Sequence, residues 1–243
     1  MSWQHIVFVT AFMIVMIALG IFLGLRYRRR NEKEKNKVLI ITAILIDSAE
    51  LFKIVFMCIR AHDPMLWKIL LPLFMCSIAL IAIPMAAFCR GRLKEASLDF
   101  VFIFGLLIAF MGTYGAGNNF GTYPVLCFDN FVSVLTHSIS GFAALYVVIS
   151  GMTSMKKRNI GISFAIISGF CVVAYIADRL IPYNYMFLMR GDGTPYDIFY
   201  NLVGGNQVLY PLIVLGLFLV YIAAFYGVYF LVQKIRTKKK TSA

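Results

Sequence analysis

The sequence predicts an all-α, polytopic membrane protein with seven transmembrane helices, its N-terminus outside and its C-terminus in the cytoplasm. Of the 243 residues, 61% are hydrophobic and only 14% are charged, whereas soluble globular domains carry roughly 25% charged residues. Apolar runs of about 20 residues, enough to cross a hydrocarbon core of ~30 Å, recur between short polar breaks. These runs are continuous and do not alternate with polar residues, which favours helices over a β-barrel.

The apolar runs divide the chain into one predicted seven-helix transmembrane domain, residues 1–243. We find no internal repeat, which speaks against the inverted-repeat transporters. The fourth span is the shortest. The predicted spans are 6–25, 38–60, 69–88, 98–114, 131–151, 160–181 and 208–232.

The orientation follows from the basic residues, which are enriched in cytoplasmic loops of membrane proteins. Eighteen of the 23 Lys and Arg residues fall in the segments 26–37, 90–94, 156–158 and 234–240. Seven spans place all four segments on one side of the membrane, and six or eight spans would divide them. The first span is expected to be an anchor, because its positive charges follow the apolar run, unlike those of a cleaved signal peptide. We therefore expect a multi-pass protein of the cell membrane.

The net charge of +12 is spread over short clusters and forms no continuous basic face, so nucleic acid is not an expected partner. The five cysteines occur singly, without the spacing of a disulfide framework or a metal site. The sequence therefore predicts no metal and no cofactor. Membrane phospholipids are the partners that this composition favours.

Ionisable residues within a span are costly, about 2.5–3.5 kcal/mol each, so each one calls for an explanation. The second predicted span holds Asp47, Glu50 and Lys53, and a spacing of three residues puts neighbours on roughly the same helix face. Two interpretations remain open for these residues. Glu50 and Lys53 form a structural ion pair, or the three charges have a functional role.

Cys76 in the third span and His137 in the fifth lie about seven residues from the predicted outer edge, so both are expected roughly 10 Å deep. An imidazole beside a thiol can accept its proton and raise the fraction of thiolate. Each residue alone is more typical of packing, since a buried Cys behaves as a small apolar side chain. Equal depth makes them a candidate nucleophile and base.

Other polar side chains gather near the same predicted outer end. Tyr175 and Asp178 close the sixth span, and Asn184 begins the long, aromatic loop 182–207. A loop of this length is expected to fold back as a cap. With Glu50 and Lys53, these residues are the candidate substrate-binding or oxyanion groups, and Lys53 and Tyr175 are the expected donors to an oxyanion.

Three short motifs resemble the bacterial YwaF-type integral membrane proteins, a group that looks related to the transmembrane protein 164 acyltransferases of ether phospholipids. They are Leu71-Pro72-Leu73 with Cys76-Ser77, His137 in the fifth span, and the stretch 184–188 after the sixth. The resemblance implies a Cys acyl carrier with a His partner, roles that fall on Cys76 and His137. The chain departs from the pattern at Phe74, where many bacterial members have His.

Three functions remain open from the sequence. The first is a lipid acyltransferase with Cys76 as nucleophile and His137 as base near the outer leaflet. The second is a small-solute or ion transporter that uses Asp47, Glu50 and Lys53. The third is a non-catalytic lipid-binding protein in which neither Cys76 nor His137 matters. A retinal protein is disfavoured, because the seventh span has no Lys for a Schiff base.

Overall fold

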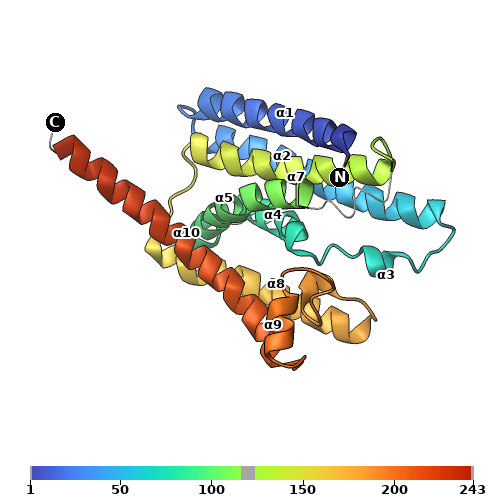
Figure 1. Ribbon diagram of the computed structural model, residues 1–243. Coiled ribbons are helices and arrows are strands. Elements are labelled where there is room, and N and C mark those ends of the chain that lie inside the picture. The colour runs from blue at the N-terminus through green and yellow to red at the C-terminus, as the bar shows by residue number, and fades with distance from the viewer. Residues whose placement is uncertain (1, 116–123, 242–243) are drawn as a thin grey trace. The chain divides into compact units, whose positions relative to one another are not determined.

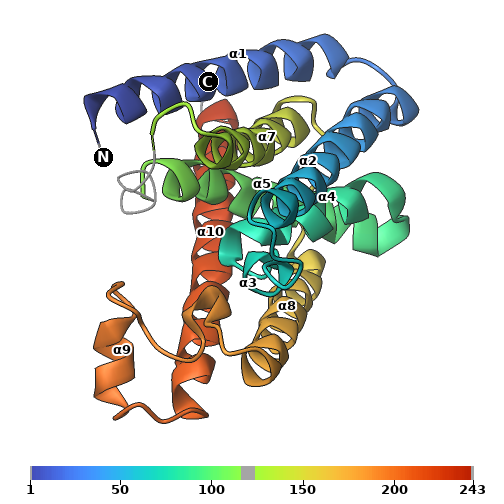
Figure 2. The ribbon, with the colours of Figure 1, turned by 90° about the vertical axis from the view of Figure 1, so that its right-hand side faces the viewer.

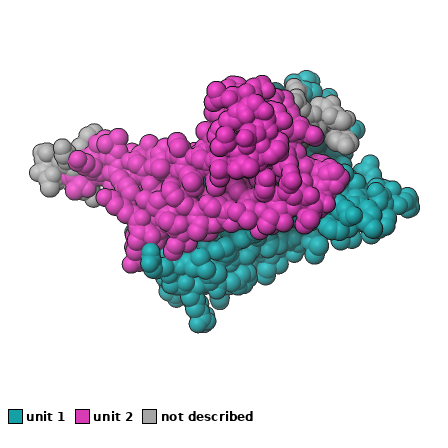
Figure 3. All heavy atoms as spheres, turned by 90° about the horizontal axis from the view of Figure 1, so that it is seen from below, with its two compact units in different colours: residues 1–154 teal, residues 155–243 magenta. Residues whose placement is uncertain are grey.

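A computed structural model of the protein describes residues 2–115 and 124–241, and the regular structure within these ranges is helical throughout (Figure 1). The chain forms two compact units, Met1–Ser154 and Met155–Ala243, which are coloured separately in Figure 3. The positions of the units relative to one another are not determined, so each is described by itself.

The described part of unit 1 contains four long helices, α1, α2, α5 and α7, with three shorter helical elements between α2 and α5. Helix α7 packs against α5, α1 and α2, and α4 packs against α5 and α2. Both ribbon views show α7 between α1 and α5 (Figures 1 and 2). The elements are α1 (Trp3–Tyr27), α2 (Glu32–Arg60), α3 (Trp67–Leu70), the 3₁₀ turn η1 (Met75–Ile78), α4 (Ala79–Phe88), α5 (Gly91–Thr113) and α7 (Phe128–Ile149).

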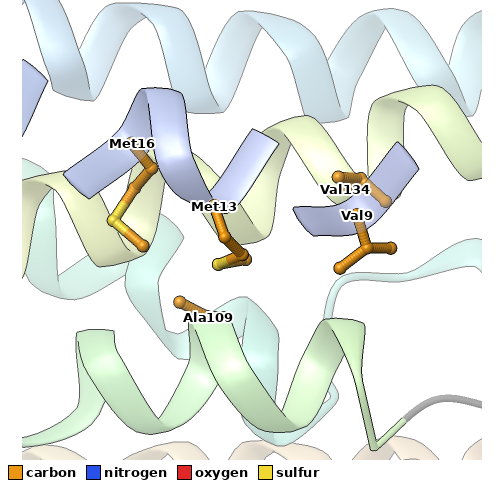
Figure 4. Close-up of a cluster of buried hydrophobic side chains, with 5 residues drawn as sticks. All are labelled: Val9, Met13, Met16, Ala109 and Val134. Atoms are coloured by element: carbon orange, nitrogen blue, oxygen red, sulfur yellow. The ribbon is translucent and has the colours of Figure 1, made fainter. Parts of the chain in front are cut away.

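A cluster of buried side chains joins α1, α5 and α7 (Figure 4). Helix α1 contributes Val9, Met13 and Met16, whose spacing of three to four residues places them on one face of the helix. Ala109 of α5 and Val134 of α7 complete the cluster. The core of unit 1 thus holds α5 and α7 in contact at Ala109 and Val134. Gly112 and His137 each follow one turn later on the same helices.

Small residues let α1 approach α7 closely. Gly20 and Gly24 lie against Leu145 and Ile149, and a methyl group on either glycine would overlap those side chains. Glycines four residues apart are a recurrent device for packing membrane helices, because dispersion contacts between close backbones drive their association. The opposite face of α1, with Ile14, is exposed and apolar, as expected for lipid contact.

The third predicted span, 69–88, is not one continuous helix. Helix α3 ends at Leu70, and Leu71 is extended (φ −52°, ψ 134°) before Pro72. A residue before proline is pushed out of the α region, and proline itself has no N–H to donate. The helix resumes with η1 and continues as α4, and Cys76 therefore sits on a 3₁₀ turn instead of inside an α-helix.

Five described helical segments are long and apolar enough to cross a membrane: Trp3–Tyr27, Gly91–Thr113, Phe128–Ile149, Lys157–Leu180 and Leu209–Thr237. The fourth predicted span is longer than expected, since α5 begins at Gly91 and not near residue 98. Helix α2 has 29 residues, a sufficient length, but it carries the charges of Asp47, Glu50 and Lys53. Seven spans and the orientation of the termini stay predictions.

Unit 2 is built on two long helices, α8 (Ile160–Leu180) and α10 (Leu209–Thr241), which pack against each other. The 3₁₀ turn η2 (Lys157–Asn159) precedes α8. Between α8 and α10 the chain forms the 3₁₀ turn η3 (Tyr185–Phe187) and the short helix α9 (Asp197–Leu202), and η3 packs on α8.

Candidate functional site

The charges of α2 form an ion pair. Lys53 Nζ lies 2.5 Å from Glu50 Oε1, and the two side chains are 23% and 10% exposed. The predicted pair between Glu50 and Lys53 is confirmed. An ammonium group carries three N–H donors, so Lys53 can bind Glu50 and donate to a second acceptor. Asp47, one turn earlier, keeps a buried Oδ1 without a hydrogen-bond partner among the described residues.

His137 on α7 is half-buried and held by its own helix. Its Nδ1 lies 2.5 Å from the backbone oxygen of Ser133, one turn earlier. A carbonyl oxygen only accepts, so Nδ1 must carry the proton in this hydrogen bond. The neutral ring then has its lone pair on Nε2. The hydrogen bond thereby fixes both the ring orientation and the tautomer that a general base needs.

The His137 ring lies against the backbone of α5 at Gly112. A methyl group at Gly112 would overlap ring atoms Cδ2 and Nε2. Gly112 comes one turn after Ala109, and His137 one turn after Val134, the two residues that bring α5 and α7 into the core of unit 1 (Figure 4). Gly112 therefore provides the space for the imidazole, and any larger residue there would displace it.

Cys76 sits on η1, just after the proline break, and is half-buried and free of disulfide bonds. Lys53 and Glu50 lie within electrostatic range of the thiol. The same pair, Lys53 and Glu50, lies within electrostatic range of His137. One ion pair on α2 thus acts electrostatically on both the predicted nucleophile and the predicted base.

A narrow apolar crevice lies beside this group of residues. It is bounded by η1, α4, α5 and α7 and has about 10 Å³ of free space, enough for about one water molecule. Ile78, two residues after Cys76, lines it, as does Ser140, three residues after His137. Segments that carry the two candidate catalytic residues therefore border the same crevice, together with Gly105 and Ile108 of α5.

The candidate residues of unit 2 are engaged within that unit. The Tyr175 hydroxyl donates to the backbone oxygen of Gln207 at 3.2 Å. Asp178 Oδ1 accepts from the Tyr185 N–H at 2.6 Å, while its Oδ2 is buried without a described partner. These contacts fold the 182–207 loop onto the end of α8, as expected of a loop that folds back.

Asn184 uses both ends of its amide to hold the loop. Its Nδ2 donates to the backbone oxygen of Arg190 at 2.8 Å and to Asp192 Oδ2 at 2.7 Å, and its Oδ1 accepts from the Met189 N–H at 2.9 Å. Burial raises the pKa of Tyr185, in the same loop, to about 12, so its phenol stays protonated at neutral pH.

Sequence reasoning missed three residues that shape unit 1. Gly112 was detectable only as a glycine in an apolar span, a common feature with no specific meaning. Ser133 acts through its backbone oxygen, for which the side chain gives no signal. Asp99 on α5 is fully buried and accepts from the Ser154 N–H at 3.0 Å, which fixes the chain after α7. Its position within the polar start of α5 hid this role.

Several apolar helices long enough to cross a membrane, with buried polar side chains such as the Glu50–Lys53 pair, define a multi-pass helical membrane protein. The model of the TMEM164 family matches residues 1–232, so the protein belongs to this family. No curated protein and no solved structure matches the chain. The family relation is thus confirmed, and the assignment to the YwaF-type group stays a prediction. In the described residues no three His, Cys, Asp or Glu side chains are grouped to hold a metal ion.

Proposed function

We propose that this protein is a membrane acyltransferase in which Cys76 carries the acyl group and His137 moves protons. The observation that carries the proposal is the hydrogen bond from His137 Nδ1 to the Ser133 oxygen, 2.5 Å long. It leaves the lone pair on Nε2, on a half-buried ring that lies against Gly112. The shared ion pair on α2 and the shared crevice support Cys76 as its partner.

In the first half-reaction, His137 Nε2 takes the thiol proton and the Cys76 sulfur attacks the carbonyl carbon of a phospholipid acyl ester. The C–O bond breaks, and the leaving alkoxide takes the proton back from His137. In the second, His137 takes a proton from an acceptor hydroxyl, whose oxygen attacks the thioester. The C–S bond breaks, and the thiolate recovers the proton. No redox change occurs.

Lys53 is the group in unit 1 that best suits the developing oxyanion. Its ammonium is already held by Glu50, so it loses little freedom when it donates a further hydrogen bond. A donor fixed before the reaction stabilises the charge that appears in the transition state, a contribution of about 3–4 kcal/mol in acyl transfer enzymes.

The test is acyl labelling of purified protein in phosphatidylcholine vesicles that carry an alkyne-tagged acyl chain. We expect a label on Cys76 that neutral hydroxylamine removes, because a thioester is cleaved under those conditions. Cys76→Ser should lose this label. Cys89→Ser is the matched control, since Cys89 is also half-buried and belongs to unit 1 but follows the C-terminal end of α4, away from η1. Full labelling and transfer in Cys76→Ser would remove Cys76 from the mechanism, and absence of both in the wild type would leave a non-catalytic lipid-binding protein.

A transporter is the second candidate, and Asp47 is the observation that favours it. A buried carboxylate oxygen without a partner is costly in a membrane and is typical of a proton or cation path. In this case, proteoliposomes should show cation or proton flux that Asp47→Asn abolishes and Cys76→Ser leaves intact. The opposite dependence supports the acyltransferase.

A further inference from the structure

The turn between α1 and α2 carries a second polar site, far along the chain from the residues of the proposed reaction. An open hollow of about 210 Å³ is lined by five side chains, three of them cationic. Helix α1, which is long and apolar enough to span a membrane, ends at Tyr27. The hollow therefore lies at the level of the lipid head groups. Its lining residues are Arg26, Tyr27, Arg30, Glu34 and Lys37.

The inner wall of this hollow is fixed by packing. The Tyr27 ring packs edge-on against Tyr146 of α7, with centroids 6.4 Å apart. The Tyr146 hydroxyl in turn donates to the backbone oxygen of Lys35 at 3.0 Å. These contacts tie the end of α1 and the start of α2 to the same residue of α7, so the backbone that carries the cationic side chains is held in place.

The hollow carries a net positive charge even when the ion pair between Glu34 and Arg30 is subtracted. Glu34 is the only acidic residue in the lining, and its Oε2 lies 3.9 Å from Arg30 Nε, a loose contact that leaves most of the guanidinium free. The neighbouring Glu32 is paired with Lys35 instead. Guanidinium groups match phosphate oxygens with two parallel hydrogen bonds, and a lysine adds a point charge.

We propose that this hollow binds the phosphate of an anionic phospholipid head group, with Arg26, Arg30 and Lys37 as its cationic ligands. Basic residues near a membrane surface attract anionic lipids in general, without a defined site. The proposal differs from that general attraction because only three of the turn's exposed basic residues line the hollow. Arg28, Arg29 and Lys33 belong to the same turn, are exposed and stay outside it.

This division provides a matched pair of variants for the test. Arg26→Gln/Arg30→Gln/Lys37→Gln removes three charges from inside the hollow, and Arg28→Gln/Arg29→Gln/Lys33→Gln removes three from outside it. Native mass spectrometry of the full chain in mild detergent would count bound phosphatidylglycerol across a titration. We expect the first variant to weaken binding about tenfold or more and the second to weaken it less than about threefold. Equal losses in both variants would overturn the proposal.

Two further experiments separate a lipid site from a free-phosphate site and a binding defect from a folding defect. Millimolar inorganic phosphate in place of the lipid should not displace bound phosphatidylglycerol, and full displacement would show that free phosphate is the ligand and overturn the lipid assignment. If the triple glutamine variant fails to fold, Arg26→Lys/Arg30→Lys keeps the charge and removes the planar forks. It should bind phosphatidylglycerol several-fold more weakly than the wild type, and wild-type affinity in this variant would exclude a shaped phosphate site.

Discussion

The two units use their buried polar groups differently. In unit 2, Asn184 spends both ends of its amide on the loop after α8, and Tyr175 donates to the loop backbone. In unit 1, His137 uses one ring nitrogen to fix its position and keeps the other. A polar side chain whose bonds are all used within its own segment holds the fold, whereas one that is fixed and still has a free group can act on a ligand.

The comparison is therefore a hypothesis about which substitutions affect chemistry and which affect folding. Substitutions around His137 should lower the rate of acyl transfer with little loss of stability. Substitutions around Asp178 should do the reverse, because its Oδ1 holds the Tyr185 N–H and its Oδ2, although without a described partner, is buried.

The largest effect is expected for His137→Gln. Glutamine keeps a hydrogen-bonding amide of similar reach but cannot accept a proton at neutral pH, so acyl transfer should fall by about 10²–10⁴-fold. The measurement is single-turnover labelling of Cys76 at a series of pH values, with the thermal midpoint of unfolding as the check on folding. Labelling in this variant should regain speed at alkaline pH, where hydroxide deprotonates the thiol directly. An unchanged rate at neutral pH would remove His137 from the mechanism.

Gly112→Ala on α5 should also slow acyl transfer, because it displaces the His137 ring of the neighbouring helix α7. The new methyl group would occupy the space of the His137 ring, and a displacement of about 1 Å at a catalytic group can cost on the order of 10²-fold in rate. Gly169→Ala is the matched control, because nothing lies near a methyl group at that position of α8. A loss of rate in both variants would indicate a general effect of glycine replacement.

The ion pair of Glu50 and Lys53 on α2 should appear as a coupling energy between the two residues in the free energy of unfolding. Lys53→Met leaves the carboxylate of Glu50 largely buried without its partner, and we expect a loss of about 1–3 kcal/mol in unfolding free energy, less than for a fully buried pair. Glu50→Gln in the same chain should restore much of this loss. A double-mutant cycle on denaturant unfolding in detergent measures the coupling, and additive losses would contradict a direct pair.

The smallest effect on chemistry is expected in unit 2. Asp178→Leu removes the acceptor of the Tyr185 N–H, and a buried donor left without a partner costs about 1–3 kcal/mol. Limited proteolysis should then cut the 182–207 loop faster while Cys76 labelling is retained. Asp178→Asn keeps an acceptor oxygen and should resemble the wild type in both assays. A loss of transfer without faster cleavage would place Asp178 in the reaction and end the contrast between the units.

The sequence predicted part of this site correctly, and the reasons are physical. The Glu50–Lys53 pair could be expected because residues three apart on a helix are neighbours in any fold. The equal depth of Cys76 and His137 stays a prediction, and the break at Pro72, which puts Cys76 on a 3₁₀ turn, was not expected. Asp178, Asn184 and Tyr175 were singled out for polarity alone. Their hydrogen bonds reach a loop whose path no local pattern specifies.

What the sequence determined by itself is the class of the protein, because lipid imposes one requirement on every spanning segment: backbone groups must be satisfied within it, by a long apolar helix. The recurrence of such segments and the clustering of charge are local properties and can be read along the chain. Only the tertiary structure decided that the His137 ring packs on Gly112 and that Arg26, Arg30 and Lys37 share one hollow. Contacts between helices depend on side chains that lie far apart in sequence, and no local periodicity encodes which of them meet.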